Sequence, residues 1–274
     1  MAVLLSLALL APVFEEAPVI SPGSESDGIL IHGVESPFQE GTTQIRVLLP
    51  DAREPNRKYP VVFVLPVEAK NESRYGDGLA EIKKHDLHNK HHAIFVSPTF
   101  SHLPWYADHP TDPFIRQETY FLHVVVPFVE RTYPIEARPE GRLLLGFSKS
   151  GWGAWSLLLR HPDIFGRAAA WDAPLMMDRL GKYGTTPIFG TQVNFEAYRL
   201  TDLLETNREL LGSQKRFVLT GYGNFRPEHE QMHALLDKLN IAHEYRDGPL
   251  RKHDWHSGWV PEAVELLLAR HAAE

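Results

Sequence analysis

The segment LLLGFSKSGWGA, residues 143–154, decides the fold of this 274-residue chain. Its leucines are typical of a short buried strand, and a helix is expected to follow. Ser148 stands in the turn between them, with Gly146 two positions before it and Ser150 two positions after it. The pattern G-x-S-x-G between strand and helix is a nucleophile elbow, where strand and helix approach so closely that only small flanking side chains fit. We expect the small Ser150 to replace the second glycine; the alternative is an ordinary turn whose serine caps the helix.

Short apolar runs and helical patterns alternate on both sides of this segment. From about residue 60 onward this alternation predicts an α/β fold, with a mostly parallel, doubly wound sheet of about eight strands and helices on both faces. Two strands before residue 60 give the sheet an antiparallel start, after a Ser/Gly-rich loop over 21–27. The expected strands are 28–34, 42–49, 60–65, 93–96, 143–145, 168–171, 217–219 and 243–245, and the expected helices are 117–131, 151–161, 227–239 and 261–271.

Composition excludes several classes of protein. With 43% hydrophobic and 23% charged residues, the chain is an ordinary globular protein and neither disordered nor fibrous. The net charge of −7 gives no electrostatic basis for binding nucleic acid or anionic lipid. Because there is no cysteine, disulfides, thiolate metal sites and a cysteine nucleophile are excluded.

The N-terminal run MAVLLSLALLAPV, residues 1–13, is shorter than the roughly 20 residues that span a bilayer. It is typical of the apolar part of a signal peptide, with cleavage after Ala11 or Ala17. We therefore expect residues 1–20 to be a leader, residues 28–274 to be a single domain, and the protein to be exported to the periplasm or beyond. Because no basic residue precedes the run, the alternative is an N-terminal helix of a cytoplasmic protein. No other stretch reaches membrane-spanning length, so we expect no membrane span.

A second chemical signal lies near the C-terminus. The segment HDWHSGW, residues 253–259, precedes the last expected helix. Elbow enzymes carry their triad in the chain order serine, acid, histidine, with the histidine in a late loop. His253 or His256 is therefore the expected base.

Four segments in this order resemble the putative-esterase branch of the α/β-hydrolase fold, which includes esterase D, feruloyl esterases and mycolyltransferase-like proteins. They are GVESPFQEGTTQIRVLLPD from residue 33, YPVVFVLP from residue 59, GFSKSGWGA from residue 146 and HDWHSGW from residue 253. The resemblance implies a serine esterase without cofactor, acting on a small-molecule or carbohydrate-linked carboxylic ester. By this likeness Ser148 is the nucleophile, His253 is the general base and His256 is a bystander.

The acid departs from the family's pattern. The family carries an aspartate in a G-x-x-D-F turn, and here the turn reads GYGNF over 221–225, with Asn224 in its place. An amide accepts from the histidine but brings no charge to stabilise an imidazolium. Because Asn224 occupies the position of the family's acid, it is the favoured partner for orienting His253. The alternative carboxylates are Asp172, at the end of the apolar run AAAW, and Glu228 or Glu230; Asp172 is the best of them, because ligand crevices open at such strand ends.

The oxyanion hole departs as well. Where the family has Leu-His-Gly, this chain has LPVE over 65–68. Backbone N–H groups hold the oxyanion, so Val67 or Glu68 is an expected donor together with Lys149, the residue after the nucleophile. Trp105 and Tyr106 lie in a loop that resembles one near the family's active-site mouth. They line a substrate pocket or pack the loop.

Two other hypotheses stay open from the sequence. The same site also suits acyl transfer to an alcohol other than water, and a non-catalytic relative would keep the pocket only for binding. A cluster of histidines is interpreted as a solvated polar edge and not as a metal site, because the strand expected from residue 93 interrupts any helical spacing. Its members are His85, Asp86, His88, His91 and His92.

Overall fold

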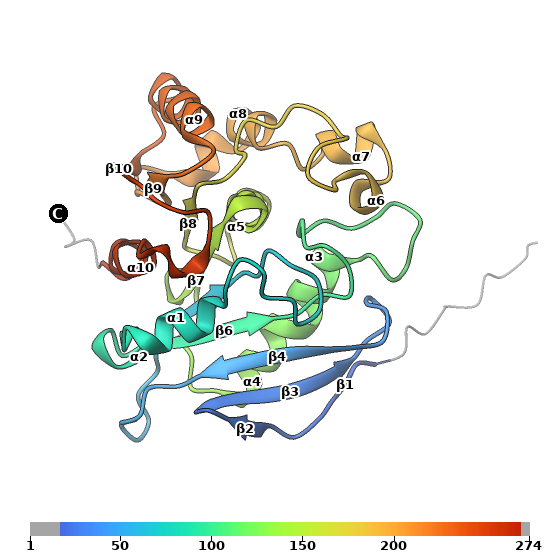
Figure 1. Cartoon of the computed structure of the whole chain (residues 1–274), viewed down its shortest axis with the longest axis vertical. Coiled ribbons are helices and arrows are strands. Elements are labelled where there is room, and N and C mark those ends of the chain that lie inside the picture. Colours follow the sequence, from blue (N-terminus) through green and yellow to red (C-terminus); the bar gives the residue numbers. More distant parts are fainter. Residues whose placement is uncertain (1–16, 270–274) are drawn as a thin grey trace, which may run out of the picture.

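A computed structural model describes residues 17–269, which form a mixed sheet of ten strands with helices on both sides (Figure 1). The strand order is β1-β3-β4-β6-β5-β7-β8-β9-β10, and β2 pairs with β3. Pairs from β6 to β10 are parallel, whereas β1 to β4 join the sheet antiparallel. The strands are β1 (Val19–Ile20), β2 (Ser24–Ser26), β3 (Ile29–Glu35), β4 (Thr42–Leu48), β5 (Val61–Val64), β6 (Ile94–Pro98), β7 (Arg142–Phe147), β8 (Arg167–Trp171), β9 (Phe217–Tyr222) and β10 (His243–Leu250).

This architecture confirms the predicted fold class, while the predicted number of strands was too small by two. The eight expected strands correspond to β3 to β10. The two additional strands are β1 and β2, which are two and three residues long and pair with β3. Because Ser24–Ser26 is polar and exposed, it carries no apolar signal. It pairs through its backbone with β3, which follows after a turn in which Asp27 and Gly28 both have positive φ.

Alternating residues of the parallel strands face two separate cores. In β5, Val61 and Phe63 belong to one core, and Val62 and Val64 belong to the other. The first core lies under α3 to α5, α8 and α9, and the second lies under α1, α2 and α10. The helices are α1 (Gly78–Lys84), α2 (Leu87–Lys90), α3 (Gln117–Tyr120), α4 (Val126–Thr132), α5 (Ser148–Arg160), α6 (Thr186–Phe189), α7 (Gln192–Glu196), α8 (Leu200–Leu211), α9 (Arg226–Lys238) and α10 (Val260–Leu268).

Three helices, α6 to α8, fill the long connection between β8 and β9 and were not expected from the sequence (Figure 1). Two of them have only four or five residues, too few for a helical period to be recognised. The helix expected over 117–131 is present as one continuous helical segment. It consists of α3, a five-residue π-helical turn (Phe121–Val125) and α4.

The expected leader falls largely on residues 1–16, which lie outside the described residues. Val19 and Ile20, the last part of the expected leader, lie in β1 opposite Glu35 and Val34. Within residues 17–269, no helix is long and apolar enough to cross a membrane.

Candidate active site

Ser148 lies at the sharp turn between β7 and α5. Its backbone has φ of +53°, in the left-handed region that non-glycine residues seldom adopt. The turn brings the strand against the helix, since a Cβ on Gly146 would lie 2.3 Å from the carbonyl oxygen of Ser150. This close approach is what the elbow motif requires of its first glycine.

The structure gives a physical reason why Ser150 stands in place of the second glycine. Ser150 is fully buried, and its hydroxyl donates to the carbonyl of Phe147 (2.9 Å) and accepts from the Phe147 N–H (3.1 Å). The serine thus caps the first turn of α5. The helix approaches β8 and the loop after it at Gly151, where a Cβ would lie 3.2 Å from the Cβ of Ala170 and 2.9 Å from that of Ala173.

His253 lies in the loop after β10 and contacts a carboxylate from the end of β8. Its Nδ1 lies 2.5 Å from Oδ2 of Asp172, with the histidine side chain 17% exposed and the aspartate fully buried. The imidazole packs edge-on against Phe147, the residue before Ser148, with ring centroids 5.0 Å apart. Tyr75 packs on it as well (5.6 Å). These contacts hold the ring beside the elbow.

Asp172 is held in its charged form by backbone donors. Its Oδ2 accepts from the N–H of Asn224 (2.9 Å) and its Oδ1 from the N–H of Phe225 (2.7 Å). Burial favours the neutral acid, but hydrogen bonds from His253 and from these amides keep the pKa of Asp172 below its ordinary value. The loop approaches so closely that a Cβ on Gly223 would lie 2.5 Å from Oδ2. The left-handed φ of Asp172 (+42°) marks the same tight geometry.

The preference for Asn224 as the partner of His253 is corrected by this geometry. The Asn224 side chain is exposed, and its contribution is its backbone N–H, which binds Asp172. The carboxylate of Glu228 accepts from the N–H of Met176 (2.9 Å), and Glu230 pairs with Arg226 (2.8 Å). Because β8 and β9 are parallel neighbours, the loops after both strands reach the same point, and position along the chain does not tell which one supplies the acid.

Two side chains anchor the loop after β5, which holds the expected oxyanion donors Val67 and Glu68. The hydroxyl of Tyr106 donates to the carbonyl of Pro66 (2.7 Å), and Nζ of Lys149 donates to the carbonyl of Val67 (3.0 Å). A peptide unit is planar and trans, so fixing a carbonyl also fixes the N–H of the next residue. Tyr106 thereby orients the N–H of Val67, and Lys149 orients the N–H of Glu68.

Lys149 is an unusual residue to find buried beside a nucleophile. Burial lowers the pKa of its ammonium group to about 8, and the nearby Glu68 carboxylate acts in the opposite direction. Glu68 is itself buried; it accepts from the N–H of Tyr75 (3.2 Å) and pairs with Arg74 (3.3 Å). A cation and a carboxylate therefore brace the same loop from inside.

Trp105 and Tyr106 are both fully buried, so they pack the loop between β6 and α3. Trp105 lies against Trp152 of α5 with ring centroids 5.5 Å apart. The ring of Tyr106 occupies the space above Gly153, where a Cβ would lie 2.1 Å from it. Of the two roles expected for these residues, packing is the one that their burial supports.

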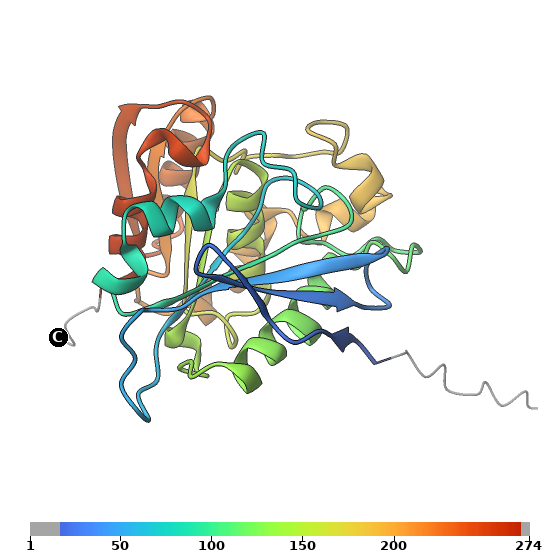
Figure 2. The ribbon, with the colours of Figure 1, turned by 60° about the horizontal axis from the view of Figure 1, so that its bottom comes forward.

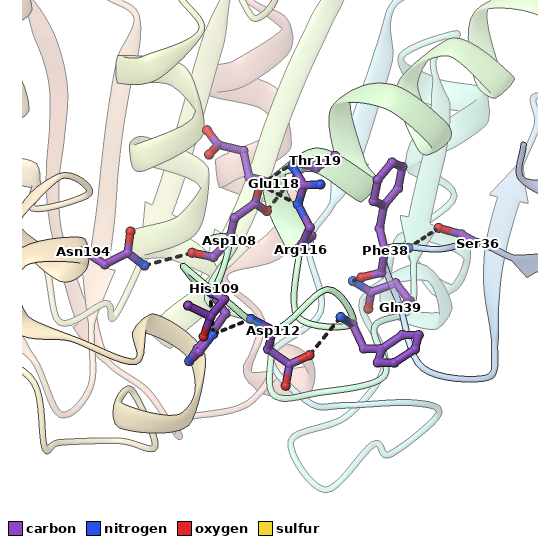
Figure 3. A network of polar contacts seen from close by, with 12 residues as sticks. Ser36, Phe38, Gln39, Asp108, His109, Asp112, Arg116, Glu118, Thr119 and Asn194 are labelled. Atoms are coloured by element: carbon purple, nitrogen blue, oxygen red, sulfur yellow. Dashed lines mark hydrogen bonds and ion pairs between the residues drawn. The ribbon is translucent and has the colours of Figure 1, made fainter. Parts of the chain in front are cut away.

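The same loop is tied down at its far end by a polar network around Asp108 (Figure 3). Its carboxylate accepts from the N–H of Thr119 (3.0 Å) and lies 3.8 Å from Nε of Arg116. Asn194 of α7 donates to the carbonyl of Asp108 (2.8 Å), which joins the connection between β8 and β9 to the loop. Tyr106 is thus mounted on a segment anchored at both α3 and α7.

His229 of α9 supports the loop after β8, which carries Asp172, and was not singled out from the sequence. Its Nε2 accepts from the N–H of Ala173, the residue after Asp172 (2.9 Å). Burial lowers the pKa of His229 to about 4, so the ring is neutral and accepts this bond at physiological pH. The sequence signal is faint, since His229 is one of 15 histidines and lies on a polar helix.

A family model, curated proteins and solved structures are similar to this chain. The family model described as "Putative esterase" matches residues 36–177. An esterase of Mycobacterium tuberculosis (strain H37Rv) is 27% identical over 139 residues, 49% of this chain and 30% of that protein. Endo-1,4-beta-xylanase Y of Acetivibrio thermocellus is 29% identical over 217 residues, 71% of this chain and 18% of that protein. The chain therefore spans less than a third of the length of these two curated relatives.

Solved structures share the fold at low sequence identity. A ferulic acid esterase matches with a TM-score of 0.66 at 19% identity, covering 88% of this chain and 96% of that one. An S-formylglutathione hydrolase from Agrobacterium tumefaciens matches with a TM-score of 0.71 at 14% identity, covering 91% and 98%. The family match covers more than half of the chain, and the fold agrees with it. The chain belongs to the Putative esterase family and has the α/β-hydrolase fold.

Proposed function

We propose that this protein is a serine esterase that hydrolyses a carboxylic ester through an acyl-enzyme on Ser148. The observation that carries the proposal is the contact between His253 Nδ1 and the buried Asp172 carboxylate, beside an elbow whose serine has a strained backbone. Strained nucleophiles and charged, hydrogen-bonded acids cluster at catalytic sites.

In the proposed reaction, Oγ of Ser148 attacks the ester carbonyl carbon while Nε2 of His253 takes the hydroxyl proton. The carbonyl oxygen becomes an oxyanion held by the N–H of Lys149 and by that of Val67 or Glu68. As the C–O bond to the alcohol breaks, His253 returns the proton to the leaving oxygen. Water then attacks the acyl carbon while His253 takes a proton from it. The bond from that carbon to Oγ of Ser148 breaks, His253 returns the proton to Oγ, and the carboxylic acid is released.

Asp172 acts in this scheme as the orienting acid. Its carboxylate accepts from Nδ1–H of His253, which leaves Nε2 as the basic nitrogen, and its charge stabilises the imidazolium that forms. The hypothesis of a non-catalytic relative is motivated by Asn224 and by the altered LPVE loop over 65–68, and the Asp172 carboxylate at His253 removes the first of these two motives.

The proposed substrate is a small-molecule or carbohydrate-linked ester, and water is the proposed acceptor of the acyl group. Support comes from the fold shared with a ferulic acid esterase and an S-formylglutathione hydrolase.

We also propose that the protein is exported, because residues 1–13 form an apolar run typical of a signal peptide. Mature protein from the native host should begin between about residues 12 and 18, and N-terminal sequencing that finds Met1 in a cytoplasmic fraction would exclude it.

The test of the proposal is labelling by a fluorophosphonate probe, together with hydrolysis of p-nitrophenyl acetate and of a feruloyl ester. The parent should be labelled and active, Ser148→Ala should lose both properties, and Ser213→Ala, which changes an exposed turn serine, should keep both. Circular dichroism checks that each variant is folded. Labelling that persists in Ser148→Ala, or a folded parent that is neither labelled nor active on either ester, contradicts the proposal. Addition of a small alcohol distinguishes hydrolysis from acyl transfer, because hydrolysis gives the free carboxylic acid and acyl transfer gives an ester of the added alcohol.

A further inference from the structure

The chain returns from α9 to β10 at the edge of the sheet (Figure 2). Two histidines and an aspartate gather at this point. His233 and Asp237 lie one helical turn apart on α9, and His243 is the first residue of β10. Taking one ligand atom from each side chain, all three atoms lie within 4.8 Å of one another. None of these residues belongs to the site around Ser148.

The two histidine rings meet at a steep angle, with planes inclined by 63° and one nitrogen of each ring in contact. Nδ1 of His233 lies 2.7 Å from Nε2 of His243. The carboxylate of Asp237 completes the group, with Oδ2 3.6 Å from Nε2 of His233 and Oδ1 4.0 Å from Nε2 of His243. Residues four apart on a helix share a face, which explains why His233 and Asp237 converge on the same point.

His243 is held in the form that a metal ion requires. Its Nδ1 lies 2.8 Å from the carbonyl oxygen of Ile241, and a carbonyl oxygen only accepts, so Nδ1 carries the proton. The lone pair of a neutral ring is then on Nε2, which points at His233 and Asp237. A backbone carbonyl that fixes the tautomer is the usual outer partner of a metal-binding histidine. The His243 side chain is only 6% exposed, so this orientation is locked.

We propose that His233, Asp237 and His243 bind a divalent first-row cation, with Zn²⁺ the best match. Two imidazole nitrogens and one carboxylate oxygen are a common ligand set for Zn²⁺, and water completes a tetrahedron. The proton that now lies between the two rings is the Nδ1–H of His233, and it moves to Nε2 of the same ring when the cation takes its place, so that both ligands stay neutral imidazoles.

The geometry needs one small adjustment to accept the ion. Two nitrogens bound to Zn²⁺ at 2.0–2.1 Å in a tetrahedron lie about 3.3 Å apart, roughly half an ångström more than the present separation. His233 can supply this movement, because its side chain is 34% exposed. Its ring stacks on that of Tyr245, with centroids 4.1 Å apart and planes inclined by 21°, so it slides in its own plane without losing that contact.

The cation would stabilise the fold and take no part in ester hydrolysis. His243 pairs with Phe217 at the start of β9, whereas Ser148 and Asp172 follow the ends of the parallel strands β7 and β8. The five residues of β8 span roughly 17 Å, which is about the distance between the two opposite ends of these parallel strands. Bound metal would clamp α9, which carries His229, to the edge of the sheet.

The test is a titration of untagged, EDTA-treated protein with Zn²⁺ and with Co²⁺, followed by calorimetry and by the Co²⁺ absorption spectrum. The variants His233→Gln and Asp237→Asn remove ligands from exposed or half-exposed positions, where the fold tolerates a change. His92→Asn is the matched control, because His92 is an exposed histidine in a left-handed backbone (φ +48°) that asparagine adopts readily.

We expect the parent and His92→Asn to bind one equivalent of Zn²⁺ with a Co²⁺ spectrum typical of tetrahedral coordination. Zn²⁺ at 100 times its Kd should raise Tm by roughly 5–10 °C. His233→Gln should weaken binding by at least about tenfold, and Asp237→Asn should weaken it as well. A parent that binds neither ion overturns the proposal, and so does a folded His233→Gln that binds as tightly as the parent. Ester hydrolysis is not needed for any of these measurements, so the result is independent of the proposed function.

Discussion

Two histidines three positions apart in the segment HDWHSGW each pair with a carboxylate, and the two pairs differ in their surroundings. His253 contacts Asp172 at 2.5 Å, and His256 contacts Glu81 of α1 at 2.8 Å; both contacts use Nδ1, and both carboxylates are fully buried. The His256 side chain is 48% exposed, whereas that of His253 is 17% exposed. The pairing of a histidine with a buried carboxylate is therefore not enough to identify a catalytic base.

The two carboxylates differ in what else they bind. Asp172 accepts from the backbone N–H groups of Asn224 and Phe225, so its charge is available to His253. Glu81 accepts from Lys84 and His85 in addition to His256, so it is the buried centre of an ion-pair cluster whose other members are partly or largely exposed. His256 also uses its second nitrogen, Nε2, which lies 3.4 Å from the N–H of Asp77. The surroundings of His256 are those of a structural pair.

The largest expected effect separates the two histidines. His253→Ala should lower kcat by about 10⁴–10⁶, because it removes both the base and the acid of the proposed reaction. His256→Ala should change kcat by less than about tenfold. Steady-state kinetics on p-nitrophenyl acetate measures both. Equal losses in two folded variants would mean that the comparison is wrong.

A smaller effect is expected from Tyr106→Phe, which removes the hydroxyl that holds the Pro66 carbonyl. With the Val67 N–H less well fixed, kcat should fall by about tenfold to a hundredfold while KM changes little, since the oxyanion forms after substrate binds. The ring that packs on Gly153 is retained, so the fold should persist. A change confined to KM would instead assign Tyr106 to substrate binding.

The pH profile tests the second anchor of the same loop. The pKa of buried Lys149 is lowered to about 8, so its ammonium is charged below that pH and loses its charge above it. Activity of the parent should fall as the pH rises through about 8, because the loop loses a cation beside Glu68. Lys149→Met should lack this fall, and Tyr106→Phe, which leaves Lys149 in place, should keep it. The same alkaline fall in all three proteins would exclude Lys149 as its origin.

The smallest effect on activity is expected from Glu81→Gln, on the structural side of the comparison. Hydrogen bonds from His256, Lys84 and His85 outweigh burial and keep the pKa of Glu81 below its ordinary 4.5. A lowered carboxylate pKa stabilises the fold above about pH 4.5, and this stabilisation is lost as the pH falls through the lowered pKa. The variant should therefore have a lower Tm at pH 7, with a gap that narrows on acidification, and an unchanged kcat. A Tm gap that widens below pH 4.5 would contradict this account.

Much of the fold could be predicted because the parallel strands carry continuous apolar runs, which are typical of strands buried on both faces. PVVFVL over 60–65 and the leucines before Gly146 correspond to β5 and β7. Two features could not be predicted: the pairing of Ser24–Ser26 with β3, and the short helices α6 and α7. They depend on backbone pairing and tertiary packing more than on a residue pattern.

At the site, the elbow and the histidine loop could be located because their residue types are constrained locally. The partner of His253 could not be assigned, because Asp172 and Asn224 follow the ends of neighbouring parallel strands and only the fold shows which side chain turns toward His253. The inward directions of Lys149 and Tyr106 likewise follow from packing, since either residue type is common in exposed loops.

The most direct test of the central claim is kcat/KM for Asp172→Asn and Asn224→Asp on one hydrolysable ester. With Asp172 as the acid, Asp172→Asn should cost about 10³–10⁴, while Asn224→Asp should not raise the rate, because it places a second carboxylate beside the first. Both folds are checked by circular dichroism. An Asn224→Asp variant that gains activity, or a folded Asp172→Asn variant within tenfold of the parent, would contradict the claim.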